Sequence, residues 1–403
     1  MLAVRDGRLL LAAQSLDALA IGVAGVALPW LVLKGGGSHG QAGLVFSLTV
    51  VPYVVFGLVA GAAGDRFPRR AVMLWAHAAQ AAVAAVIPLW TIAHTPPVAA
   101  ILPLAFAVGS ARVFADAGTF GAVASIVGPE RFGEGQATLS AAWGVGLFAG
   151  PALGGLLVAA VGPGFALAAE AVACGVAALL VLAIRSGLDQ GTDEPATGSV
   201  AAIADGVRYV LRSKPIATYN AVIVAINVAG AGSYALLVPL LRDHVDLPAR
   251  QVGAIMAAGE LSAVAAAAVV GPLTRRFGGD RLFAAGLVIG PLAIAALGLA
   301  GGFAAAAAAT IPFLAVESTV SVVAIGERQR RAPADLQARV GIAGRMAALG
   351  AVAVGSAIAS ALSGPLGLGH LYLVMGAAAF AVALISAPFV LRLDAPRPAS
   401  ADR

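Results

Sequence analysis

Long apolar stretches separated by short polar turns recur along the whole chain. An α-helix needs about 20 apolar residues to cross the hydrocarbon core of a bilayer. Twelve stretches reach that length, at approximately residues 9–33, 41–63, 71–93, 98–122, 136–161, 163–184, 216–241, 251–273, 282–301, 303–326, 339–363 and 369–392. The pattern predicts an all-α polytopic membrane protein with twelve transmembrane helices, of which the first is retained rather than cleaved.

The longest polar break, residues 185–217, divides the chain into two halves. Its first part carries acids, Gly, Pro and Ser without apolar periodicity, which is typical of a flexible linker. Its second part predicts an amphipathic helix on the membrane surface, from the helical spacing of Val200, Ile203, Val207 and Leu211. We expect a six-helix bundle over 1–184, a cytoplasmic linker over 185–215, and a second six-helix bundle with a short tail over 216–403.

Composition agrees with a bilayer environment. The chain is 60% hydrophobic and 11% charged, whereas a soluble domain is roughly 25% charged. A single cysteine, Cys174, excludes a disulfide framework and a multi-cysteine metal or redox site. The net charge of +5 is scattered through turns instead of forming a basic patch. We therefore expect the lipid bilayer, and no nucleic acid, as a partner.

The basic residues divide unequally between the two sides of the predicted membrane. With both termini placed in the cytoplasm, twenty lysines and arginines fall in cytoplasmic segments. Arg112 and Arg345 lie within spans, and the three on the outside are Lys34, Arg242 and Arg250. Because positive residues accumulate on the cytoplasmic side of membrane proteins, the sequence predicts a multi-pass protein of the cell membrane with both termini cytoplasmic.

Two of the predicted cytoplasmic turns repeat one another. The chain reads GAAGDRFPRR from Gly61 and GPLTRRFGGDR from Gly271, 210 residues later, and the Arg-Phe pair at 66–67 matches the pair at 276–277. A weaker repeat relates the small-residue runs at 150–155 and 355–360. A duplicated six-helix unit, giving two pseudo-symmetric bundles, explains both repeats.

The turn after the second span resembles a family signature. Gly61, Asp65, Arg66, Arg69 and Arg70 are similar in type and spacing to the loop between helices 2 and 3 of the major facilitator superfamily. The resemblance implies a conformational gate, in which the acid faces a helix N-terminus of the other half and the arginines pair across it. A helix macrodipole favours a carboxylate in that place. The alternative is that these arginines only set the topology.

The fifth predicted span carries a second motif, formed by Gly146, Gly150, Pro151, Gly154 and Gly155. Glycine at every fourth position allows close approach of a neighbouring backbone, and proline removes a hydrogen bond and bends the helix. The motif resembles the helix 5 motif of the superfamily's proton-coupled exporters. Generic helix packing is the alternative.

Three further segments resemble the drug:proton antiporter branch of that superfamily, which contains macrolide-efflux and enterobactin-export proteins. They are VALPWLVL at 26–33, the stretch 129–157, and APADLQARVG at 332–341. The resemblance implies a monomeric transporter that exports a hydrophobic or amphipathic small molecule of the drug or antibiotic type in exchange for protons, by alternating access.

Sequence motifs argue against ATP as the energy source and against an enzyme, but they leave several transport and non-transport functions open. The chain has no glycine-rich ATP-binding loop, no histidine-rich metal motif and no nucleophile elbow. We therefore expect a proton gradient as the energy source, no cofactor or metal, and no enzymatic activity. The alternatives are a siderophore or metabolite exporter of the same fold, a proton-coupled importer, and a transport-inactive receptor or scaffold.

Ionisable residues inside membrane spans are costly and mark functional sites. In the superfamily, helices 1, 4, 7 and 10 line the central cavity, and the first, fourth and tenth spans supply the proton-coupling candidates Asp17, Arg112, Asp116 and Glu317. Arg112 and Asp116, four residues apart, share one helix face. We expect either a static ion pair that fixes helices 1 and 4, or an arginine that shifts between Asp116 and Asp17 as one of them takes a proton. Glu317 is either a protonation site or a hydrogen-bonded structural group.

Other polar and aromatic residues within the spans complete the candidates. Glu260 and Arg345 are expected to pair within the second half, and His77 and Glu170 to serve packing at the periphery. An apolar, aromatic cavity with few polar groups suits large amphipathic ligands. On helix membership, we expect substrate contacts from Trp30, Phe114, Asn220, Asn227, Tyr234 and Phe313.

Overall fold

A computed structural model describes residues 1, 4–185, 188, 207–333 and 336–391, except the side chains of Asp65, Phe120, Pro129 and Ala338. Its long helices are α1 (Arg5–Lys34), α2 (His39–Arg66), α3 (Arg69–Ala93), α4 (Val98–Val127), α5 (Phe132–Val161), α6 (Pro163–Leu182), α8 (Lys214–Ala235), α10 (Ala249–Phe277), α11 (Gly279–Gly298), α12 (Phe303–Arg331), α13 (Gln337–Leu366) and α14 (Leu368–Leu391). Short turns of helix are η1 (Pro129–Arg131), α9 (Leu237–Pro239) and η2 (Leu240–His244).

The twelve predicted transmembrane helices are confirmed, since the described part of the chain has twelve helices long and apolar enough to span a bilayer. Their boundaries differ in places. α12 continues five residues beyond the predicted end, because Glu327 and Arg331 pair one turn apart at 3.1 Å and stabilise its polar last turn. Of the predicted amphipathic helix, residues 207–212 are helical, and residues 200–206 lie outside the described part of the chain.

The two halves repeat the same helix contacts. In the first half, α1 packs against α5 and α6, α3 against α4 and α6, and α2 against α4. The second half repeats each contact, with α8 against α13 and α14, α11 against α12 and α14, and α10 against α12. Between the halves, α2 packs against α13 and α5 against α10. This one-to-one correspondence is what a duplicated six-helix unit produces.

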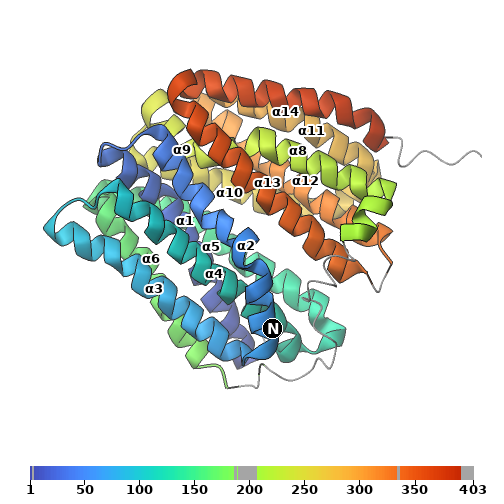
Figure 1. Ribbon diagram of the computed structural model, residues 1–403, viewed down its shortest axis with the longest axis horizontal. Coiled ribbons are helices and arrows are strands. Elements are labelled where there is room, and N and C mark those ends of the chain that lie inside the picture. The colour runs from blue at the N-terminus through green and yellow to red at the C-terminus, as the bar shows by residue number, and fades with distance from the viewer. Residues whose placement is uncertain (2–3, 186–187, 189–206, 334–335, 392–403) are drawn as a thin grey trace, which may run out of the picture.

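Figure 1 shows two helical bundles that lie close together at the end where α9 is found and diverge toward the opposite end. We call these the α9 end and the Arg66 end; the arginine distribution predicts that the α9 end is external. Along α2, a Cβ added at Gly40 or Gly43 meets α13, whereas a Cβ added at Gly57 or Gly61 meets nothing within 4 Å. The halves are therefore in contact at the α9 end and separated at the Arg66 end.

Glycines bring α1 and α5 into backbone contact. A Cβ on Gly150 would lie 2.7 Å from the Gly22 Cα, and a Cβ on Gly22 would lie 2.5 Å from the Pro151 Cδ. A Cβ on Gly155 would lie 2.9 Å from the Gly253 Cα of α10. The helix 5 motif thus packs α5 against α1 within one half and against α10 of the other.

We expect Gly150→Val to destabilise the protein, because the new side chain meets the α1 backbone and no flexible side chain can move aside. Overpacking of this kind costs about 1–3 kcal/mol, seen as a lower melting temperature in detergent. Gly25→Ala on α1 is the matched control, since its Cβ meets nothing within 4 Å. Equal melting temperatures for Gly150→Val and Gly25→Ala would contradict the close α1–α5 packing.

Candidate functional site

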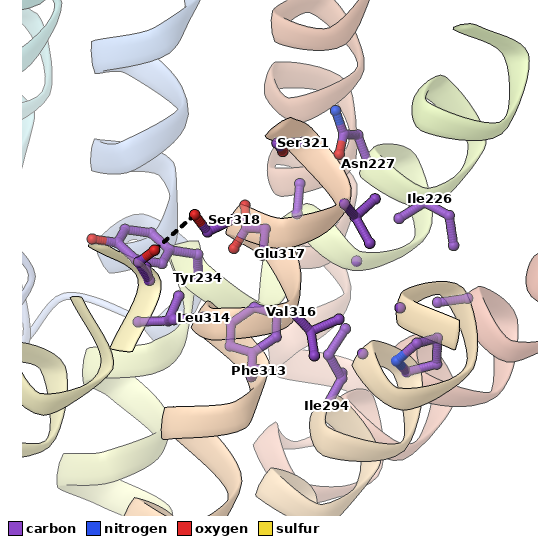
Figure 2. Close-up of a pocket in the computed structure, with 18 of the residues that line it drawn as sticks. Ile226, Asn227, Tyr234, Ile294, Phe313, Leu314, Val316, Glu317, Ser318 and Ser321 are labelled. Carbon is purple, nitrogen blue, oxygen red and sulfur yellow. Dashed lines mark hydrogen bonds between the residues drawn. The ribbon is translucent and has the colours of Figure 1, made fainter. Parts of the chain in front are cut away.

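The second half contains a cavity of about 350 Å³ between α8, α10, α11 and α12, with Phe46 of α2 contributed by the first half. Predominantly apolar side chains form its walls (Figure 2). The predicted substrate residues Asn227, Tyr234 and Phe313 all line it, and Phe46 and Tyr234 pack with ring centroids 5.3 Å apart. A cavity with apolar walls and few polar groups is the usual form of a small-molecule site.

Two carboxylates line this cavity. Glu317 lies on α12 with its side chain exposed to the cavity, and Glu260 on α10 accepts a hydrogen bond of 2.9 Å from the Tyr234 hydroxyl. The lining residues, which all belong to the described part of the chain, include no lysine, arginine or histidine. The cavity therefore combines aromatic walls with uncompensated acidic groups.

The first half buries a separate charged group. Asp17 of α1 is 1% exposed, and its carboxylate lies 3.6 Å from the Arg112 Nε of α4 and 3.8 Å from the His77 Nδ1 of α3. His77 is 0% exposed. Glu170 of α6 is also buried and close enough to interact electrostatically with both Asp17 and Arg112. We call Asp17, His77, Arg112 and Glu170 the buried cluster.

Asp116 lies between the buried cluster and the other half. It is half-buried and accepts a hydrogen bond of 2.7 Å from the Tyr53 hydroxyl of α2. The exposed Arg345 guanidinium on α13, in the second half, is close enough to attract its carboxylate. Asp116 thus interacts electrostatically across the interface between the halves.

The structure shows the Arg112–Asp17 pair, one of the two pairings expected for this arginine. Asp116 accepts a hydrogen bond from Tyr53 instead. Two other predicted placements differ from the structure. Glu260 accepts a hydrogen bond from Tyr234, and the expected Glu260–Arg345 pair is absent among the described contacts. Arg345 is instead close enough to attract Asp116. His77 and Glu170 are interior instead of peripheral, because α3 and α6 pack directly against each other and α6 against α1.

Three predicted substrate residues do not line the cavity. Trp30 lies at the α9 end, where the Arg242 guanidinium stacks 5.0 Å from its ring. Asn220 lies toward the other end of α8 and accepts a hydrogen bond of 2.7 Å from Arg328. Phe114 is half-buried on α4, outside the set of cavity-lining residues.

The loop after α2 makes contacts within the first half. Arg69 donates to the carbonyls of Gly121 at 3.3 Å and Leu188 at 3.1 Å, and Arg70 donates to the Leu182 carbonyl. Arg66 is exposed. A Cβ added at Gly61 would meet nothing within 4 Å. The side chain of Asp65 lies outside the described residues, so the gate across the two halves stays a prediction.

Polar contacts close the α9 end between the halves. The Ser47 and Ser356 hydroxyls hydrogen-bond at 2.7 Å, joining α2 to α13 in a buried position. Nearer the surface, the His39 Nε2 lies 3.0 Å from an Asp243 carboxylate oxygen of η2. Sequence reasoning missed these residues, together with Tyr53 and Phe46, because each is a single polar or aromatic residue without a recognisable pattern.

Two pseudo-symmetric bundles of six helices, with a ligand-sized cavity and buried charges between their helices, define the architecture of a membrane transporter. The chain matches the family model described as Major Facilitator Superfamily over residues 10–327. The protein belongs to the major facilitator superfamily.

Relatives and solved structures agree with this assignment. The chain is 31% identical over 259 residues to the multidrug efflux pump Tap of Mycobacterium tuberculosis. This match covers 62% of this chain and 61% of Tap. It is 27% identical over 301 residues to the class C tetracycline resistance protein of Escherichia coli, covering 72% and 73% of the two chains. The match thus spans about three fifths of Tap.

The fold is shared with distant transporters. The structure of the nucleoside transporter NupG superposes with a TM-score of 0.76 at 11% identity, covering 98% of this chain and 100% of NupG. An inward-facing, unoccupied bacterial homologue of the human lysosomal transporter Spinster superposes with a TM-score of 0.77 at 13% identity, covering 96% and 95%. At these identities the similarity concerns the fold alone.

Proposed function

We propose that the protein is a secondary active exporter, which releases a hydrophobic or amphipathic small molecule to the outside in exchange for protons. The observation that carries this proposal is the placement of acids in both halves, at a cavity in one and in the interior of the other. Buried ionisable groups are expensive and are kept where they move ions or bind ligands. The similarity to Tap and to the tetracycline resistance protein supports export over import.

Proton coupling is assigned to Arg112 and its two acidic neighbours. Arg112 lies beside Asp17 and one helical turn from Asp116 on the same face of α4. Uptake of a proton in this group weakens the hold of Asp17 on the guanidinium and turns it toward Asp116. That turn competes with the attraction between Asp116 and Arg345 across the halves, so the proton changes the stability of one conformation relative to the other.

The cavity favours positively charged amphipathic substrates. Glu260 and Glu317 offer negative charge, and Phe46, Tyr234 and Phe313 offer aromatic faces. Aromatic rings attract cations as well as apolar surfaces. A protonated amine joined to a flat apolar body satisfies both features, whereas an anionic siderophore meets two like charges.

The conformation of the molecule fits the first step of export. With the termini in the cytoplasm, the closed α9 end faces outward and the separated Arg66 end faces the cytoplasm. Substrate then enters the cavity from inside the cell. Opening of the α9 end requires loss of the His39–Asp243 and Ser47–Ser356 contacts.

Transport by inverted membrane vesicles tests this function. With an imposed proton gradient, acidic inside, we expect vesicles that contain the protein to accumulate a lipophilic cationic dye. The accumulation should collapse on addition of an uncoupler and be lost in Asp17→Asn, because removal of the charge leaves Arg112 without its partner. Vesicles without the protein are the control.

Each competing function gives a different result in the same vesicles. Dye movement that continues unchanged without a gradient rules out antiport. Gradient-driven loss of preloaded dye from the vesicle lumen indicates import. No protein-dependent flux for cationic, neutral and anionic probes alike contradicts transport and favours a receptor or scaffold.

A further inference from the structure

The buried cluster contains a histidine whose position the exchange cycle described above leaves without a role. His77 is fully buried, and neither ring nitrogen has a hydrogen-bond partner among the described residues. Both oxygens of Asp17 are likewise without a hydrogen-bond partner there. Buried polar groups are nearly always paired, so two such groups side by side, 3.8 Å apart, indicate an interaction that forms in another state.

We propose that His77 carries the coupled proton of the first half and releases Arg112 by replacing it as the partner of Asp17. The inference rests on the proposed proton-coupled transport. In this inference, His77 is a positioning residue for Arg112. The group that holds the coupled proton is the His77 imidazole and not one of the carboxylates.

The charges balance in both states. Without the extra proton, Arg112 pairs with Asp17, Arg345 attracts Asp116, and His77 is neutral. One proton taken from solvent reaches Asp17 and passes to the His77 Nδ1, which gives an imidazolium–carboxylate pair. Arg112 then turns one helical turn along α4 to Asp116, and Arg345 loses its partner in the first half.

The surroundings of His77 make this exchange possible. The charged groups near it are Asp17 from α1 and Arg112 from α4. Glu170 and Cys174 of α6 are close enough to interact electrostatically with that pair. Arg112 is the one fixed positive charge among them. If Arg112 moved away while His77 stayed neutral, Asp17 would be an unpaired charge in the interior, at a cost of several kcal/mol. Histidine is the side chain best suited to gain a proton in the physiological pH range.

The test compares two kinds of flux in His77→Asn. We expect proton-driven uphill transport to fall at least about tenfold and to lose its pH dependence, while exchange of labelled for unlabelled substrate without a gradient stays within about twofold of wild type. Gln80→Leu is the matched control, because Gln80 is fully buried one turn away on α3 and does not titrate. It should keep the wild-type pH profile.

The outcomes separate this inference from the proposed function. A wild-type protein without proton-driven flux contradicts the function, and the inference falls with it. If the wild type shows proton-driven flux and His77→Asn keeps the same pH profile, the inference is overturned and the proposed function stands. An equal change of the pH profile in Gln80→Leu also overturns the inference, because loss of any buried polar side chain of α3 would then be enough to change the profile.

A second measurement needs no variant. In wild-type protein with ¹⁵N-labelled histidine, the solvent-protected imidazole of His77 should change from neutral to charged on acidification and return to neutral when cationic dye saturates the protein. A His77 ring that stays neutral between about pH 9 and about pH 5, where transport is active, overturns the inference.

Discussion

Replacing Arg112 by methionine is expected to give the largest loss of transport among single substitutions, at least about 100-fold in gradient-driven flux. The substitution leaves the Asp17 carboxylate 1% exposed and without its cationic partner. While His77 is neutral, no group compensates this buried charge, which costs about 3–5 kcal/mol. The amount of folded protein should fall as well, measured by its melting temperature in detergent.

A double variant separates folding from coupling. In Arg112→Met with Asp17→Asn, neither the guanidinium nor the carboxylate is present, so the melting temperature should recover toward wild type. Gradient-driven transport should stay lost, because no group remains to move between Asp17 and Asp116. Recovery of transport in the double variant would show that the pair serves only the fold.

The membrane helices could be predicted from the sequence because apolar length is a property of each segment alone. α12 shows where this reasoning ends. Its apolar stretch stops near residue 326, but the Glu327–Arg331 pair extends the helix by a further turn. Such pairs depend on side-chain spacing, which a count of apolar residues does not include.

The candidate site could be predicted only in part. A charge within an apolar span identifies Asp17 and Arg112 as unusual, and the spacing of Arg112 and Asp116 places them on one face. Spacing does not say which neighbouring helix that face meets, and the structure turns Arg112 toward α1. Likewise, helix membership placed His77 at the periphery, whereas its face of α3 packs toward the interior.

Small residues were more informative than charges. The glycines of the helix 5 motif predict close packing wherever a neighbour is present, and both neighbours are found, α1 at Gly150 and α10 at Gly155. Packing can be predicted from residue size, whereas the direction of transport depends on how proton and substrate binding bias the two conformations.

Removing the negative charge from the cavity is expected to change which substrates move. In Glu317→Gln, we expect transport of a lipophilic cation to fall by roughly 10- to 100-fold, the range of about 1.4–2.8 kcal/mol. A neutral amphipathic probe of similar size should be transported within about twofold of the wild-type rate, because the aromatic walls are unchanged. Glu260→Gln should give a smaller loss, since the Tyr234 hydroxyl can still donate to the amide oxygen.

The control for this experiment is Glu134→Gln. Glu134 is an exposed acid on α5 that pairs with Arg131 at 3.0 Å, outside the cavity. Glu134→Gln removes one negative charge, as Glu317→Gln does, without altering the cavity, so both probes should move at wild-type rates. If Glu317→Gln lowers transport of the cation and the neutral probe equally, Glu317 acts in the transport cycle itself. The negative charge of the cavity would then not select the substrate.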